Sequence, residues 1–338
     1  MDIVTHGVLG ALVVQSVTPA KSLRAATLIG FFAALLPDLD VLINSTTDPL
    51  LVLEYHRHFT HSLFFAPLAA LLITFISAPL LAAHFSRTRL FGLILLAYSS
   101  ACLLDLCTSY GTYVLWPLID DAFALSIIAV VDPVFTALLA IAMISAWRGR
   151  RQHRAKIGLI LGLSYLALGW LQHERAATAA GVLAEERGLT AVDIQVKPTM
   201  GNLLLYRAVT LVPEEQLYVD AIRAGIQIHI YPGEQRRLVA IDELTELPPE
   251  SRAYRDLLRY QQLNAPLLIA HSEDPWLIGD ARYAMLPTRA DPLWGLQVDP
   301  LRPDTVPEFV TRRKLTPAMR QAFITMLMGK NLHQQEKN

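Results

Sequence analysis

Histidine and aspartate side chains recur beside the apolar runs of the first 132 residues. Imidazole and carboxylate are the standard protein ligands of Zn²⁺ and also bind Mn²⁺ or Fe²⁺. Ionisable groups near membrane depth are costly and are usually paired or functional. A mixed set without a thiolate suggests a catalytic site with an open position. The pattern therefore predicts a divalent metal, zinc first and manganese or iron as alternatives, with its ligands among His6, Asp38, Asp40, His56, His58, His61, Asp105 and Asp132.

Such a metal would make a bound water more acidic and polarise a substrate oxygen. Arg57 is the only strong cation expected among these residues, and it could hold a phosphate or a carboxylate. Asp38 or Asp40 could act as a general base if the metal does not occupy it fully. The predicted catalytic residues are therefore Asp38, Asp40 and Arg57.

Each of these residues, taken alone, has a simpler explanation. His6 could be an interfacial side chain, and Asp38 and Asp40 could belong to a polar loop. Asp132 could only cap a helix, and His61 could support a neighbouring group. His56 and His58 could be solvated. The metal hypothesis depends on five separate segments meeting at one membrane face.

Long apolar runs predict the helices that would carry these segments. Hydrophobic residues make up 53% of the 338 residues and charged residues only 17%, against about 25% charged in a typical soluble protein. Several runs are shorter than the roughly 20 residues that span a bilayer. We expect about six helices, at 3–17, 23–36, 62–83, 90–106, 122–147 and 157–171. In the fifth run, Asp132-Pro133 predicts a helix start, with Asp132 as its N-cap.

Lysine and arginine residues fall in alternate connections between these runs. They occupy the connections after the first, third and fifth runs, whereas 90–146 contains neither residue type. The positive-inside rule places those three connections in the cytoplasm. The N-terminus, the 37–61 and 107–131 loops and the C-terminal region then lie outside, in the periplasm of a bacterial inner membrane. The first six residues lack a basic n-region, so we expect no cleaved signal peptide.

The chain after about residue 177 has the composition of a soluble domain. We predict strands at 203–211, 216–231 and 276–286, and helices at 251–263 and 316–328. The fold class is therefore a membrane α-helical bundle at 1–175 followed by a soluble, extracytoplasmic α+β domain at 176–338. The formal net charge of −1 gives no indication of a nucleic-acid partner.

Several spaced motifs over about residues 1–150 together resemble the YdjM-like family of inner-membrane proteins, which are described as metal-dependent hydrolases. The motifs are Thr5-His6-Gly7 with Gly10, Pro37-Asp38-Leu39-Asp40, His56-Arg57, Thr60-His61-Ser62, Asp105, Thr108-Ser109-Tyr110-Gly111-Thr112, Trp116-Pro117 and Asp132-Pro133. The resemblance implies His6, Asp38, His56, His61 and Asp105 as site residues. Their order is also distantly similar to that in zinc-dependent phospholipase C, which hints at phosphoesters.

The chain departs from the family pattern at Ala101. Family members commonly have a histidine four residues before the aspartate that matches Asp105. Either a metal is held by fewer ligands, or His58 or Asp120 and Asp121 substitute, or activity has been lost.

Two functions follow as expectations. The first is a membrane-bound metal-dependent hydrolase at the outer face, acting on an amphiphilic substrate such as a lipid or isoprenoid phosphate ester. The alternative is a non-catalytic metal- or lipid-binding membrane protein whose C-terminal domain engages a partner that the sequence does not identify. A transporter is disfavoured because the chain shows no clear inverted repeat of broken helices.

Overall fold

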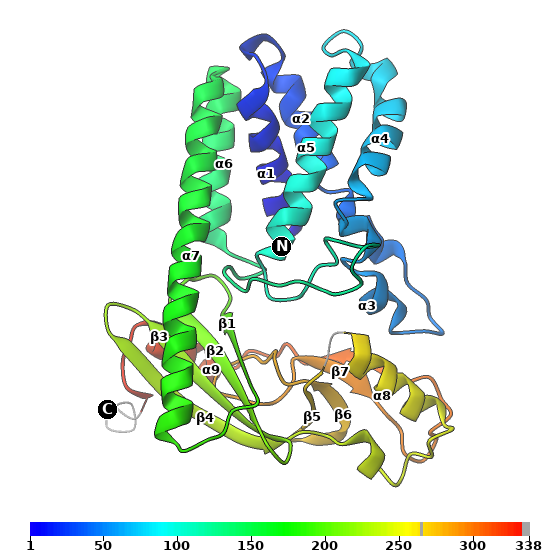
Figure 1. Ribbon diagram of the computed structural model, residues 1–338, viewed down its shortest axis with the longest axis vertical. Coiled ribbons are helices and arrows are strands. Elements are labelled where there is room, and N and C mark those ends of the chain that lie inside the picture. The colour runs from blue at the N-terminus through cyan, green and yellow to red at the C-terminus, as the bar shows by residue number, and fades with distance from the viewer. Residues whose placement is uncertain (264–265, 333–338) are drawn as a thin grey trace. The chain divides into compact units, whose positions relative to one another are not determined.

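The computed structural model describes residues 1–263 and 266–332 (Figure 1). The chain forms two compact units. The first unit comprises Met1–Ile43, Tyr55–Trp170 and Met200–Asn202. The second unit comprises Asn44–Glu54, Leu171–Thr199 and the chain from Leu203 onward. The sequence predicts one boundary at 175/176. In the structure, Asn44–Glu54 precedes that boundary but belongs to the second unit, and Met200–Asn202 follows it but belongs to the first.

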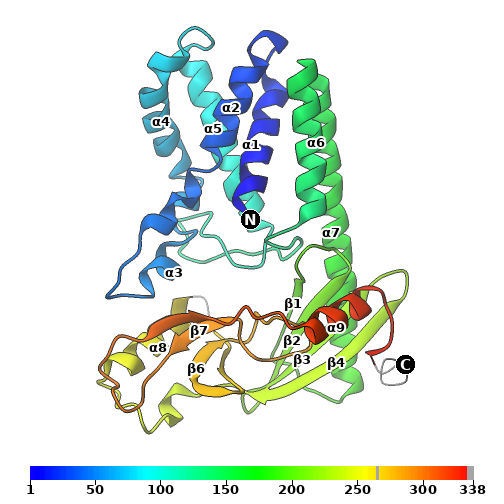
Figure 2. The same cartoon turned by 180° about the vertical axis from the view of Figure 1, so that it is seen from behind.

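The first unit is a set of helices that run side by side (Figures 1 and 2). Helix α1 contacts α2, α5 and α6, and α4 packs on α5. A Cβ atom added at Gly10 of α1 would lie 2.4 Å from the carbonyl oxygen of Gly30 in α2, so these two helices pack closely only because both positions are glycine. The helices are α1 (Ile3–Val17), α2 (Leu23–Ala33), α4 (Ala66–Leu81), α5 (Arg87–Leu106), α6 (Pro133–Gly149) and the first half of α7 (Gln152–Glu186).

Among the described residues, three helical segments are long and apolar enough to cross a membrane, namely Ala20–Leu42, Arg87–Leu106 and Gln152–Glu186. The bent pair Leu51–His61 and Ala66–Leu81 makes a fourth if it is one span. Helices α1 and α6 are apolar but shorter. The predicted apolar helical region is therefore confirmed, while length and composition support up to four crossings instead of six.

Helix α6 begins where the sequence predicted. The Asp132 carboxylate accepts a hydrogen bond from the Phe135 N–H at 3.0 Å, and Pro133 occupies the first turn. Asp132 Oδ2 also accepts from the Tyr165 hydroxyl at 2.9 Å. One oxygen of this buried carboxylate therefore caps α6, and the other accepts a hydrogen bond from Tyr165 of the following helix.

Helix α7 is much longer than the apolar run at 157–171 that predicted it. It has 35 residues and ends at Glu186, followed by Gly188 in the left-handed region at φ 66°. Its second half is rich in alanine, the strongest helix former. The predicted domain boundary therefore falls inside a continuous helix.

The second unit contains two antiparallel four-stranded sheets, in strand orders β1-β2-β3-β4 and β5-β6-β7-β8. Alanines of α7, such as Ala176 and Ala180, pack with Val196 and Tyr206 of the first sheet. Helix α8 (Arg252–Leu263) packs on the second sheet, and α9 (Pro317–Leu327) contacts β3. The strands are β1 (Asp193–Pro198), β2 (Leu205–Val212), β3 (Gln216–Ala224), β4 (Ile228–Arg237), β5 (Leu268–His271), β6 (Asp274–Asp280), β7 (Trp294–Gln297) and β8 (Glu308–Thr311).

Two of the sequence expectations for this unit need correction, and four of its strands were not predicted. The predicted strand region 216–231 is two strands separated by a turn before Ile228. The predicted strand 276–286 ends at Asp280, where the chain turns. Strands β1, β5, β7 and β8 had no sequence prediction because each has only four to six residues, too few for a clear alternation of apolar and polar positions.

Candidate metal centre

Asp105 forms the base of a buried cluster of imidazole and carboxylate groups. It lies in the last turn of α5 and is fully buried. Its Oδ1 is 3.2 Å from Nε2 of His6 on α1, and its Oδ2 is 3.1 Å from Nε2 of His61. Each oxygen of this carboxylate therefore faces one imidazole, and both imidazoles are also fully buried.

Asp38 closes the cluster from the turn Pro37–Leu42 that follows α2. Its Oδ2 is 3.1 Å from His6 Nδ1, and its Oδ1 is 3.4 Å from His61 Nε2. The Asp38 side chain is 15% exposed, whereas the side chains of His6, His61 and Asp105 are inaccessible. Asp38 is therefore the one of these four side chains that is partly accessible. His6, Asp38 and Asp105 each offer a ligand atom within 4.8 Å of the other two.

Three buried atoms of the cluster have no hydrogen-bond partner among the described residues. They are His6 Nδ1, His61 Nε2 and Asp105 Oδ2. Buried polar atoms are nearly always satisfied, so three together need an explanation. Ligand atoms on one tetrahedral Zn²⁺ lie about 3.3 Å apart, because Zn–N and Zn–O bonds are about 2.0 Å long. His61 Nε2 lies 3.4 Å from Asp38 Oδ1 and 3.1 Å from Asp105 Oδ2, which matches that separation. His6 Nδ1 lies 3.1 Å from the other Asp38 oxygen. These donors fit a divalent cation.

Hydrogen bonds behind His61 fix which of its ring nitrogens faces the cluster. The Thr60 hydroxyl donates to Asp40 Oδ2 at 3.0 Å, so its oxygen can accept from His61 Nδ1, 3.1 Å away. We assign the proton of a neutral His61 to Nδ1 on this network. The lone pair of Nε2 then points toward Asp38 and Asp105, as in metal-binding histidines that donate through their other nitrogen.

Asp40 is a supporting residue in this arrangement. It is only 1% exposed. One oxygen lies 2.9 Å from His56 Nδ1, and the other accepts from the Arg57 backbone N–H at 2.8 Å and from the Thr60 hydroxyl. The sequence offered Asp40 as a general base, but its oxygens already face these protein groups. Its geometry suits the orientation of His56 and His61 better.

Arg57 is buried against Asp105. Its Nη2 is 3.1 Å from Asp105 Oδ1, and its Nη1 donates to the Thr108 hydroxyl at 2.7 Å. Its guanidinium carbon lies 5.3 Å from the centre of the Tyr110 ring. The Met1 ammonium also contacts Asp105. Arg57 has a left-handed backbone conformation, at φ 61°, which is uncommon for a residue with a side chain and often marks a functional segment.

The other predicted histidines lie outside the inner cluster. The His56 ring faces Asp40 and lies 5.5 Å from that of Tyr110. His58 Nε2 is 3.6 Å from Asp120, and its ring centre is 4.6 Å from that of Tyr113. The structure thus gathers four of the five predicted metal ligands directly, and it places His56 behind Asp40. Asp132 serves as the helix cap described above.

Sequence reasoning missed Tyr98. This buried residue donates its hydroxyl proton to the Thr60 carbonyl and so supports the segment that carries His61. It precedes Asp105 by seven residues, or two helical turns, on the same face of α5. This spacing could have indicated that Tyr98 lies near the cluster. Ala101, one turn before Asp105, is fully buried in an apolar cluster with Ala97 and Ile94.

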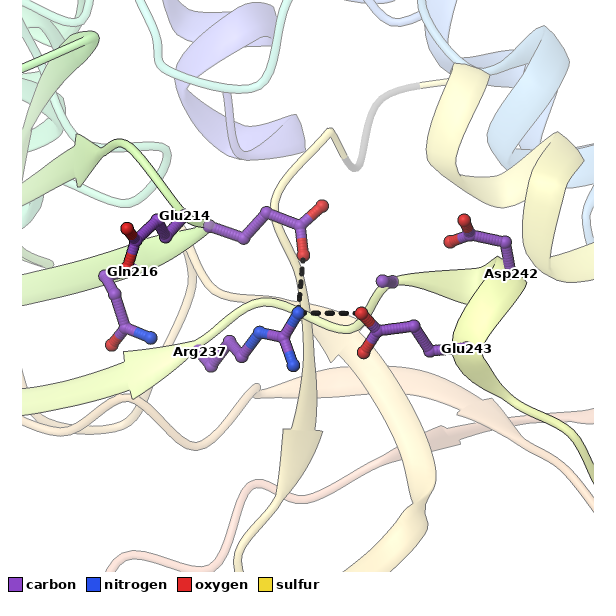
Figure 3. Close-up of a pocket in the computed structure, with 7 residues that line it drawn as sticks. Glu214, Gln216, Arg237, Asp242 and Glu243 are labelled. Carbon is purple, nitrogen blue, oxygen red and sulfur yellow. Dashed lines mark hydrogen bonds and ion pairs between the residues drawn. The ribbon is translucent and has the colours of Figure 1, made fainter.

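The second unit has a hollow of about 480 Å³ at the β2–β3 turn (Figure 3). Arg237 crosses it and pairs with Glu243 at 2.8 Å and with Glu215 at 3.7 Å. The lining is otherwise mainly acidic and open, and it contains no histidine or cysteine. This hollow shows no arrangement of groups for catalysis.

Comparison with known families decides the affiliation of the chain. A family model described as YdjM inner membrane protein matches residues 1–176. The chain belongs to this family. The match includes every residue of the cluster and ends within α7, so most of the second unit lies beyond it. It supports an inner-membrane location and confirms the resemblance seen in the motifs. No curated protein and no solved structure matches the chain, so the similarity to zinc-dependent phospholipase C stays a prediction.

Proposed function

We propose that this YdjM family member is a membrane-bound metal-dependent hydrolase. His6, Asp38, His61 and Asp105 would hold the metal, with zinc the first candidate. The observation that carries the proposal is the set of three buried ring and carboxylate atoms without a hydrogen-bond partner in the described chain, all facing the same cluster. Four separate segments supply these side chains, which is typical of sites built in the interior of helical bundles.

Different side chains of the cluster would have different roles in hydrolysis. A bound divalent metal would polarise a substrate oxygen and promote ionisation of water. Asp38, the partly exposed carboxylate, would accept a proton from the attacking water. Arg57 Nε donates to no acceptor within the described residues, so it could bind an anionic oxygen of the substrate. Asp40 and Thr60 would hold His61 in its ligand orientation.

An amphiphilic phosphate ester fits the surroundings of the cluster. Leu39, Val41 and Leu42, which flank Asp38 and Asp40, are each about half exposed or more. In a membrane such side chains would meet lipid, so a lipid or isoprenoid phosphate could reach Asp38 laterally. Water would form a new bond to phosphorus while the bond from phosphorus to the lipid alcohol breaks, and the departing alcohol would take up a proton.

We propose that all six long helices of the first unit cross the membrane and that the cluster faces the periplasm. The connections α1–α2, α4–α5 and α6–α7 lie at one end of the helices (Figure 1). These are the connections that carry lysine and arginine, which favours the cytoplasm for that end. The second unit would then be periplasmic. Cysteine labelling at Ser45 and at Arg87 from either side of the membrane tests this topology.

The activity itself is tested on Asp38→Ala and His61→Ala, with His84→Ala as the matched control. His84 is exposed in the α4–α5 connection. The purified proteins are given phospholipid and isoprenyl phosphate in mixed micelles, and released phosphate or phosphoalcohol is measured. The proposal expects turnover in the wild type and control, and none in the two cluster variants, all four being folded. Full activity in both cluster variants would rule out the metal mechanism.

A non-catalytic role is the second candidate, and Asp105 supplies the observation that favours it. Arg57 and the Met1 ammonium already neutralise this carboxylate, and Ala101 replaces the histidine common in the family. In this reading the cluster binds metal for structure or binds a lipid head group, while the second unit engages a partner. Cobalt substitution distinguishes the candidates, because an open catalytic site shows an exchangeable water and a closed site does not.

A further inference from the structure

Residues Asn44–Glu54 connect two parts of the cluster but belong to the second unit. In the sequence they lie between Asp40 and His56, whose side chains are 2.9 Å apart. The chain therefore leaves the cluster after Asp40, becomes part of the second unit, and returns to the cluster at His56. Whatever holds this segment also constrains the residues at both of its ends.

Apolar packing anchors the middle of the segment. Leu50 is fully buried and belongs to a cluster with Leu247, Leu257 and Tyr260. Leu53 is partly buried at the edge of the same cluster. Burial of these leucines removes apolar surface from water, which favours keeping the eleven-residue segment, 44 through 54, in place.

Arg259 of α8 forms ion pairs with two acidic residues of the segment, Asp48 in its middle and Glu54 at its end. Its Nη1 donates to both oxygens of Asp48, at 2.9 and 2.8 Å, and its Nη2 pairs with Glu54. The side chains of Arg259, Asp48 and Glu54 are between 25 and 35% exposed, so water screens these ion pairs only partly. A guanidinium shared by two carboxylates fixes geometry as well as charge.

We propose that Arg259 is a positioning residue for the metal centre and that the second unit orders the cluster through Asn44–Glu54. The part of this inference that concerns metal rests on the proposed function. Glu54 is two residues before His56 and seven before His61. Between them Arg57 holds its left-handed conformation, which persists only where the surrounding structure imposes it. The ion pair between Arg259 and Glu54 is one such constraint.

The experiment compares the full-length wild type with Arg259→Ala, Arg259→Lys and Asp48→Asn in detergent. Arg255→Ala is the matched control, since Arg255 is exposed on the same helix. Hydrogen–deuterium exchange at residues 55–61 reports order in the returning segment, and exchange in β2 reports folding of the second unit. Zn²⁺ affinity is measured by competition with a chromophoric chelator.

We expect faster exchange at 55–61 in Arg259→Ala and Asp48→Asn, with β2 unchanged. We also expect Zn²⁺ affinity to fall by about tenfold, the lower end of the loss seen when direct partners of metal ligands are removed, because Arg259 acts on the ligands only through the segment. Arg259→Lys, which keeps the charge but loses the planar fork, should lie between these variants and the wild type. The control should match the wild type.

Unchanged exchange and unchanged Zn²⁺ affinity in folded Arg259→Ala would overturn the inference and leave the proposed metal site standing. If the wild type binds no Zn²⁺, the proposed function fails, and exchange at 55–61 alone decides whether Arg259 positions this segment. If Arg259→Ala does not fold, the comparison between Asp48→Asn and Arg255→Ala gives the same decision.

Discussion

His61 Nε2 and Asp105 Oδ2 lie 3.1 Å apart in the interior of the first unit, yet neither atom has a hydrogen-bond partner among the described residues. With the His61 proton on Nδ1, both atoms are acceptors, and two acceptors this close repel each other unless a cation or a proton lies between them. His6 Nδ1 also has no hydrogen-bond partner among the described residues and lies 3.1 Å from Asp38 Oδ2. These closely spaced, unpartnered buried atoms are the physical reason to expect a metal.

Asp105→Asn should remove the metal and destabilise the protein. The substitution keeps the volume but leaves the Arg57 guanidinium buried beside a neutral amide. Loss of one partner of a buried ion pair typically costs about 3–5 kcal/mol. Metal content by mass spectrometry and the thermal unfolding midpoint in detergent measure the two effects. An Asp105→Asn protein with normal metal content would show that Asp105 is not a ligand.

Asp38→Asn and Asp40→Asn should have different effects on turnover and on metal affinity. Asp38 is the partly exposed member of the cluster, so its loss should abolish turnover at any metal concentration. Asp40 supports His56 and His61 from behind, so its loss should weaken metal affinity by about 10–100-fold and leave residual turnover at saturating metal. Titration of activity with Zn²⁺ separates these outcomes. Equal, metal-independent loss in both variants would contradict the supporting role of Asp40.

Arg207→Met should destabilise the second unit. Arg207 on β2 donates from Nη1 to the carbonyls of Pro287 and Arg289, at 3.1 and 2.6 Å, and from Nη2 to that of Ala281 at 2.5 Å. Methionine keeps the packing but leaves these buried carbonyls unpaired, at a cost of about 3 kcal/mol. The thermal unfolding midpoint, with hydrogen–deuterium exchange in β2 as the readout, measures the loss of stability. A midpoint equal to that of the wild type would show that water replaces the guanidinium.

Lys197 should make the second unit less stable as the pH falls. Burial lowers the pKa of the Lys197 ammonium well below its usual value, and the group lies 4.3 Å from the centre of the Tyr283 ring. Between the lowered folded-state pKa and the unfolded value of about 10.4, the unfolded chain binds more protons. Stability therefore rises with pH across this window and is lowest below the folded-state pKa.

Lys197→Met removes this proton uptake. Its unfolding midpoint relative to the wild type should be highest near neutral pH, and the difference should shrink as the pH rises toward 10. Differential scanning fluorimetry of the full-length proteins between pH 7 and 10 measures the difference. A difference that is constant with pH would show that Lys197 has the same protonation in both states.

The helical region could be predicted because its signals are local. The Asp132-Pro133 start of α6 and the apolar runs follow from residue type and spacing. The length of α7 could not be predicted from hydropathy, since its alanine-rich half is stabilised by packing on the first sheet. The short strands β5 and β7 are likewise defined by their neighbours.

For the candidate site, charge alternation indicated that His6, Asp38, His61 and Asp105 would share one end of the helices. It could not indicate that Arg57 turns inward to Asp105, because that depends on a left-handed backbone at a residue that rarely adopts one. The ion pair between Arg259 and Asp48 joins positions 211 residues apart in the sequence, so no local sequence pattern could predict it.

Elemental analysis of the detergent-purified wild type beside folded His61→Ala shows whether this cluster binds a metal. We expect near-stoichiometric zinc, manganese or iron in the wild type and its loss in the variant. Absence of metal from both proteins, even after reconstitution with added ions, would rule out the metal centre and favour a lapsed site in which Ala101 marks the missing ligand.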